Sequence, residues 1–108
     1  MSFIPKILII AGSDSGGGAG IQADIKAITY FKAYAMTAVT AITAQNTIGV
    51  QSIYPLPKEI VMNQIQSVLS DLSPDVIKIG MLADIEIINY ISKNIRNFKI
   101  CKRVKKRC

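Results

Sequence analysis

Residues 6–20 read KILIIAGSDSGGGAG, and this stretch decides the fold. Its first six residues form a short Ile-rich apolar run, which is typical of a strand buried on both faces. The next seven include four glycines and two serines, a composition that excludes regular structure. Ile21, Ile25 and Ile28 then recur at helical spacing. The segment therefore predicts a strand, a glycine-rich loop and a helix that opens near Ala19.

The rest of the chain repeats this alternation. Strands are predicted over residues 36–44 and 76–80, and helices after Pro57 and after Asp84. Residues 45–57, rich in Gly, Pro, Asn and Gln, are predicted to be a loop or a short extended connection. Strands that alternate with helices imply right-handed crossovers and a parallel sheet. The predicted class is α/β.

Length and composition predict one globular domain. The chain has 108 residues, of which 50% are hydrophobic and 19% charged, and this balance excludes a disordered or disulfide-rich protein. No apolar run reaches the roughly 18 residues that a membrane span needs. We expect a cytoplasmic protein with no membrane partner.

The charge is unevenly distributed. Residues 1–92 carry five Lys or Arg against all seven acids, whereas residues 93–108 carry eight cations and no acid. Nucleic-acid binding by this basic end is disfavoured, because no aromatic residue follows Phe98 to stack on bases. Cys101 and Cys108 match no zinc spacing and the chain has no His, so no metal site is predicted.

The glycine loop fits neither well-known phosphate motif. The dinucleotide pattern that starts at Gly16 has Ile21 in place of its last glycine, and the P-loop pattern that starts at Gly12 has Gly18 in place of lysine. Asp14 would also repel a phosphate. The loop is therefore predicted to hold a neutral or hydroxylated ligand whose hydrogen bonds carboxylates accept. Alternatively, the glycines bind no ligand and only allow a tight turn and close packing of the helix against the strand.

Chemically useful residues follow the other predicted strands. Gln45 and Asn46 end one strand, and Gly80 and Met81 end another. Because the carboxyl ends of parallel strands share one edge, these residues and the loop should meet in one crevice. An amide suits the edge of a heterocycle and a thioether suits the face of a ring. A solvated Gln and a core Met are the alternatives, and Asp24 is either near this crevice or an acid favoured by the helix dipole.

Three segments carry a resemblance to a known family: AGSDSGGGAGIQADIK (11–26), TAITAQNTIGVQSIYPL (40–56) and IKIGML (77–82). In this order they resemble the N-terminal part of the hydroxymethylpyrimidine and phosphomethylpyrimidine kinases of thiamine biosynthesis, which belong to the ribokinase-like superfamily. The resemblance runs from about Ile7 to about Phe98.

The resemblance implies a three-layer fold with a mostly parallel sheet, usually in a homodimer. It implies phosphorylation of 4-amino-5-hydroxymethyl-2-methylpyrimidine and then of its monophosphate, with ATP and magnesium. It also implies that Gly12, Asp24 and Gln45 bind the pyrimidine and that Met81 forms a wall of the site. Ser15 stands where the family often has proline, which predicts a more flexible loop.

The same resemblance predicts an incomplete kinase. Family members are more than twice this length, and the G-x-G-[CD] segment that carries their catalytic base and anion hole has no counterpart here. We expect residues 1–98 to be a domain truncated after about three strands by a premature stop or frameshift, and residues 99–108 to be an unstructured basic tail. Such a chain would not be a competent kinase alone. The alternatives are a non-catalytic pyrimidine-binding module and one half of a split kinase, completed by a separate C-terminal half.

Overall fold

A computed structural model describes residues 3–82, 84–95 and 99–101 of the chain. The elements in chain order are β1 (Lys6–Ser13), α1 (Gly20–Tyr30), β2 (Tyr34–Gln45), β3 (Val50–Pro55), α2 (Lys58–Asp71), β4 (Val76–Ile79), α3 (Ile85–Asn94) and β5 (Lys99–Cys101). The predicted α/β class is confirmed, and each of the predicted strands and helices is present within a few residues of its expected bounds.

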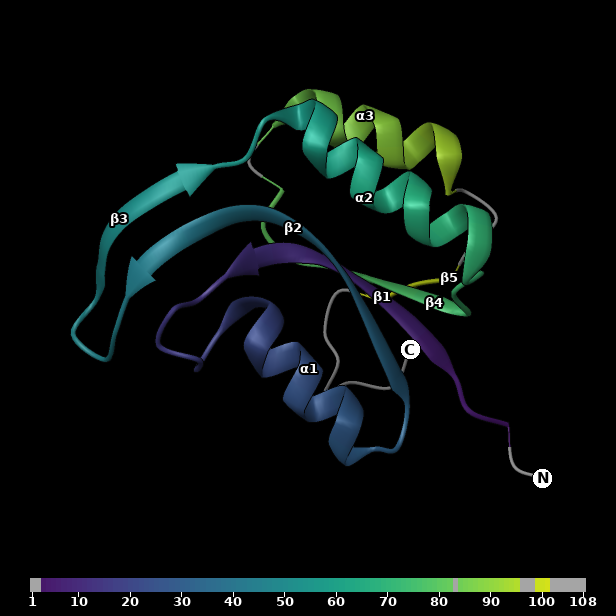
Figure 1. Ribbon diagram of the computed structural model, residues 1–108, viewed down its shortest axis with the longest axis horizontal. Coiled ribbons are helices and arrows are strands. Elements are labelled where there is room, and N and C mark those ends of the chain that lie inside the picture. Colours follow the sequence, from purple (N-terminus) through teal and green to yellow (C-terminus); the bar gives the residue numbers. More distant parts are fainter. Residues whose placement is uncertain (1–2, 83, 96–98, 102–108) are drawn as a thin grey trace.

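The strands form one sheet in the order β3-β2-β1-β4-β5. β1 runs parallel to both of its neighbours, β2 and β4, and β5 runs parallel to β4, whereas β3 pairs antiparallel with β2. Figure 1 shows α1 on one face of the sheet and α2 and α3 together on the other. This arrangement gives three layers, as the ribokinase-like resemblance implies.

Two strands differ from the predictions. β3 lies inside the segment expected to be a loop or short extended connection, and all six of its residues are exposed. It forms because the chain turns back after Gln45 and pairs antiparallel with the edge of β2 that faces away from β1, from Ala41 opposite Pro55 to Gln45 opposite Val50. β5 lies in the tail expected to be unstructured, so that expectation is wrong for Lys99–Cys101, which pair with β4. Tail residues 102–108 lie outside the described part of the chain.

The core has two halves because β1 is central and successive side chains on a strand point to opposite faces. Leu8 and Ile10 face α2 and α3, where they join a cluster with Ile65 and Ile91. The intervening residues of β1 face α1, and their cluster is Ile9, Ala11 and Ile28. The uninterrupted apolar run at the start of the chain is therefore explained by burial on both sides.

One glutamine fastens α2 to the edge of β2. The Val39 N–H donates to Gln64 Oε1 at 2.8 Å, and Gln64 Nε2 donates to the Val39 carbonyl at 2.9 Å. The side-chain amide thus makes the two hydrogen bonds that a neighbouring strand would make, just before the β3 ladder begins at Ala41. It satisfies a backbone N–H and C=O of β2 that face neither β1 nor β3.

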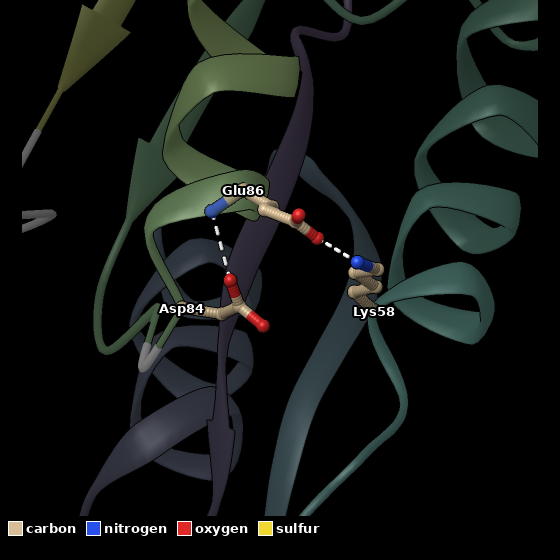
Figure 2. A network of polar contacts seen from close by, with 3 residues as sticks. All are labelled: Lys58, Asp84 and Glu86. Atoms are coloured by element: carbon tan, nitrogen blue, oxygen red, sulfur yellow. Dashed lines mark hydrogen bonds and ion pairs between the residues drawn. The ribbon is translucent and has the colours of Figure 1, made fainter.

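The start of α3 is fixed by two polar contacts (Figure 2). Asp84 is the N-cap, and its Oδ1 accepts a hydrogen bond from the Glu86 N–H at 2.8 Å. The Glu86 side chain forms an ion pair with Lys58 at the start of α2, and this hydrogen bond raises the pKa of the Lys58 ammonium above its usual range. The ion pair thereby holds the N-termini of α2 and α3 together.

None of the helices described is long and apolar enough to cross a membrane.

Candidate functional site

A cavity of about 270 Å³ lies where the carboxyl ends of β1, β2 and β4 meet the loop that leads into α1. Three of the four predicted ligand-binding residues line it, namely Gly12, Gln45 and Met81. Gly80 also lines it, as the convergence of strand ends predicted. Its volume is just below the range of roughly 300–1,000 Å³ typical of drug-sized ligands, which suits a compact ligand with one ring.

The glycine loop is filled by its own carboxylate. Asp14 is 6% exposed, its Oδ1 accepts from the Gly16 N–H at 2.7 Å, and its Oδ2 accepts from the N–H groups of Gly18 and Ala19 at 3.0 and 2.8 Å. Three backbone donors of the loop before this helix, which could otherwise bind an anion, are therefore occupied. We expected carboxylates to accept hydrogen bonds from the ligand, and the structure corrects this for Asp14, which serves the loop itself.

Two glycines of this segment, Gly12 and Gly20, lie where a side chain would clash with neighbouring atoms. Gly20 has φ +59°, and a Cβ there would lie 2.3 Å from the Gly12 carbonyl oxygen. At Gly12, a Cβ would lie 2.8 Å from the Cε of Met81. Met81 is held after β4 by its carbonyl, which accepts from the buried Thr40 hydroxyl at 2.7 Å. Glycine at position 12 therefore makes room for the Met81 thioether at the cavity wall.

Gln45 is fixed at both its backbone and its side chain. Its N–H donates to Ser15 Oγ at 2.7 Å, and the same hydroxyl donates to the Gln45 carbonyl at 2.7 Å. The side-chain Oε1 accepts from the Thr43 hydroxyl at 3.1 Å. No described residue accepts from Gln45 Nε2, so this NH₂ group is free to donate to a ligand in the cavity.

Asn46 and Asp24 serve other parts of the structure. Asn46 Oδ1 accepts from the Ile48 N–H at 3.0 Å and so shapes the turn between β2 and β3 rather than the cavity wall. Asp24 is not among the lining residues either. Its Oδ2 lies 2.7 Å from the Nζ of Lys78, and both side chains are largely buried, at 13% and 14% exposed. Asp24 thus contacts Lys78, which lines the cavity, but does not line the cavity itself.

Lys78 lines the cavity and was not among the site residues predicted from the sequence. It pairs with Ile9 in the β1–β4 register and so shares the α1 face of the sheet. A Cβ on Gly80 would lie 3.5 Å from the Lys78 Nζ and 2.7 Å from the Cβ of Ala11, so glycine keeps this wall open beside the ammonium. An ammonium has three N–H donors, and Asp24 accepts one of them. A lysine within the otherwise apolar strand VIKI (Val76–Ile79) is the sequence feature that could have predicted its role in the cavity.

The sequence matches the phosphomethylpyrimidine kinase family over residues 14–105. Among curated relatives, the probable thiamine biosynthetic bifunctional enzyme of Oryza sativa is 52% identical over 96 residues, covering 89% of this chain and 18% of the relative. The hydroxymethylpyrimidine/phosphomethylpyrimidine kinase of Bacillus subtilis is 50% identical over 95 residues, covering 88% of this chain and 35% of the relative. The chain thus spans between about a fifth and a third of these proteins.

Solved structures agree with the sequence match. A phosphomethylpyrimidine kinase from Clostridium difficile superposes with a TM-score of 0.79 at 47% identity, covering 89% of this chain and 41% of that one. The pyridoxal kinase of Staphylococcus aureus, in complex with AMP-PCP and pyridoxal, superposes with a TM-score of 0.77 at 37% identity, covering 92% and 39%. The nucleotide in that complex is in keeping with ATP use among these kinases. By its sequence match and its fold, this chain belongs to the phosphomethylpyrimidine kinase family of thiamine biosynthesis.

Proposed function

We propose that the cavity binds a neutral aminopyrimidine that carries a hydroxymethyl group, and that the chain supplies the pyrimidine-binding part of a hydroxymethylpyrimidine/phosphomethylpyrimidine kinase. The observation that carries this proposal is the convergence of Gln45, Lys78 and Met81 on one small cavity. The relatives' names give the substrate class, and the residues in the cavity supply the matching chemistry.

The donors in the cavity favour a pyrimidine over a pyridine. Gln45 Nε2 and the Lys78 ammonium both offer N–H groups, so a ligand that satisfies both must present two acceptors. A pyrimidine places two nitrogen acceptors in its ring, whereas pyridoxal has one ring nitrogen and must use a substituent oxygen as the second acceptor. Met81 provides a polarizable thioether for the ring face. Lys78 is paired with Asp24, and the carboxylate of Asp14 also lines the cavity, so the wall carries no net positive charge that would call for an anionic ligand.

Phosphoryl transfer needs more than these residues. It depends on donors and metal ions that stabilise charge on the transferred group. The described residues include no cluster of three His, Cys, Asp or Glu side chains that could hold a metal ion. Magnesium in phosphoryl-transfer sites is held mainly by one or two carboxylates together with substrate phosphates and water, and three of the loop's backbone donors are held by Asp14. The role we propose for this chain is to bind and orient the pyrimidine, with ATP and magnesium engaged by a complementing C-terminal half. A homodimer and a cytoplasmic location remain predictions.

Ligand-dependent thermal stability tests the proposal. Millimolar 4-amino-5-hydroxymethyl-2-methylpyrimidine should raise the Tm of the 108-residue chain, because a ligand that binds only the folded state stabilises it. Pyridoxal should raise the Tm less. Gln45→Leu and Lys78→Met should each weaken pyrimidine binding about fivefold or more, the factor that corresponds to one hydrogen bond of about 1 kcal/mol.

The matched control is Gln66→Leu, which makes the same change on the exposed face of α2. This variant should bind the pyrimidine as the wild-type chain does. A wild-type Tm that is indifferent to the pyrimidine would refute the proposed function, and a larger shift with pyridoxal would reassign the site to a pyridine.

A further inference from the structure

We propose that Ser15 is a positioning residue that fixes Gln45, and through it the orientation of the bound ligand. The ligand part of this inference rests on the proposed function. Ser15 lies in the glycine loop, yet its hydroxyl contacts the end of β2, 30 residues further along the chain. It accepts from the Gln45 N–H and donates to the Gln45 carbonyl, each at 2.7 Å.

This pair of hydrogen bonds replaces a missing neighbour strand. The β1–β2 ladder ends with Ser13 opposite Ile42, so β1 does not reach the backbone of Gln45. On its other side, Gln45 pairs with Val50 of β3. The Ser15 hydroxyl supplies one acceptor and one donor where β1 would have continued, and so satisfies a backbone N–H and C=O with a single side chain.

The contact is tight because the loop has no side chain at the next position. A Cβ on Gly16 would lie 3.1 Å from the Gln45 carbonyl oxygen and 3.3 Å from the Asn46 Cα. The loop itself is held from within by Asp14, whose Oδ1 accepts from the Gly16 N–H. Asp14, Ser15 and Gln45 are thus joined in one hydrogen-bonded series, so the loop and the end of β2 keep a fixed separation.

That separation determines where the Gln45 amide can reach. The backbone of Gln45 is held by Ser15. The Thr43 hydroxyl has a single proton, which is shared between the Ser13 carbonyl at 2.8 Å and Gln45 Oε1 at 3.1 Å. These contacts together restrict where the Gln45 Nε2 group can donate. If Ser15 lacked its hydroxyl, the Gln45 backbone could shift toward solvent, and the amide would lose its preorganised geometry. Preorganisation of this kind raises affinity by lowering the ordering cost of binding.

Two measurements on the full chain test the inference, using Ser15→Ala and Ser15→Thr. Ser15→Ala should speed hydrogen exchange at the Gln45 N–H about fivefold, the factor for one hydrogen bond of about 1 kcal/mol. It should also weaken binding of 4-amino-5-hydroxymethyl-2-methylpyrimidine about threefold to tenfold by the same reasoning. Ser15→Thr keeps the hydroxyl and should restore both. Ser70→Ala removes an exposed serine hydroxyl on α2, whose hydrogen bond to Ser67 lies far along the chain from the cavity, and should change neither.

A double-mutant cycle separates positioning from mere stability. In a Gln45→Leu background, Ser15→Ala should no longer weaken pyrimidine binding, because its effect passes through the Gln45 amide. An unchanged exchange rate at the Gln45 N–H would overturn the inference outright. Faster exchange with unchanged affinity, or an equal loss of affinity in the Gln45→Leu background, would overturn the positioning role. If the wild-type chain itself binds no pyrimidine, the proposed function fails, and the ligand part of this inference is overturned with it.

Discussion

At the scale of single residues, Asp14 is the side chain on which the glycine loop depends. It is buried, and its two oxygens accept three backbone hydrogen bonds from Gly16, Gly18 and Ala19. Its own N–H donates to Gln22 Oε1 at 2.8 Å, which ties the loop to α1. The carboxylate therefore does for this loop what a bound anion does for a phosphate-binding loop.

Removal of this carboxylate should destabilise the protein strongly. Asp14→Ala leaves three N–H groups without their acceptor, and we expect a loss of about 3 kcal/mol in the free energy of unfolding. Asp14→Asn keeps one acceptor oxygen and should lose less. Urea denaturation measures both, with Asp71→Ala as the control, since Asp71 is exposed at the end of α2. Equal midpoints for Asp14→Ala and the control would contradict this account.

At the scale of elements, Gln64 holds α2 on the sheet through the backbone of Val39. Gln64→Ala removes both hydrogen bonds, and we expect it to cost about 2 kcal/mol of stability. Gln64→Glu keeps the acceptor for the Val39 N–H but loses the donor, so its effect should be intermediate at high pH. Thermal and urea unfolding provide the measurement. Asn63→Ala, on the exposed face of α2, is the control and should leave the midpoint within experimental error.

The junction of α2 and α3 gives a pH-dependent prediction. The hydrogen bond and charge of Glu86 raise the pKa of Lys58 above its ordinary value of 10.5. Because the folded pKa is the higher one, the stabilisation is fully present below the unfolded pKa and is lost as pH rises through the folded pKa. Glu86→Gln should lower the Lys58 pKa, measured by NMR titration, more than Glu59→Gln does. The pair is exposed to solvent, so its effect on stability should be small and should shrink with added salt.

At the scale of the whole molecule, the β2–β3 ribbon exposes apolar side chains. Ile42 and Tyr54 lie directly opposite each other in the ladder and are 50% and 62% exposed, and Ile53 is exposed on the other face of the ribbon. Strand edges and apolar patches of this kind favour association. We therefore expect the chain to form dimers or larger oligomers in solution.

Sedimentation velocity tests this expectation. The wild-type chain should sediment faster as its concentration rises, and replacing both residues, as in Ile42→Thr with Tyr54→Thr, should reduce that dependence because less apolar area is buried on association. Asn63→Thr on exposed α2 serves as the control. A compact monomer at every concentration tested would contradict the expectation.

Local patterns in the sequence predicted the α/β class and the crevice at the strand ends. Three of these patterns are local, because each lies within a single element or loop. They are the apolar run of β1, the glycine loop, and the helical spacing of Ile21, Ile25 and Ile28. The parallel alternation then requires that strand ends converge, so Gln45 and Met81 could be placed at one crevice without coordinates.

Which side chains meet in this crevice depends on long-range packing that the sequence patterns do not specify. Lys78 and Asp24 are 54 residues apart, and Ser15 and Gln45 are 30 apart. Their contacts depend on strand register and on the crossover of α1, which hydrophobic periodicity leaves unspecified. The same holds for β3, whose exposed residues carry no burial pattern and which forms by pairing with the free edge of β2. Local periodicity reports which face of an element is buried, whereas partners distant in sequence are set by how those faces pack.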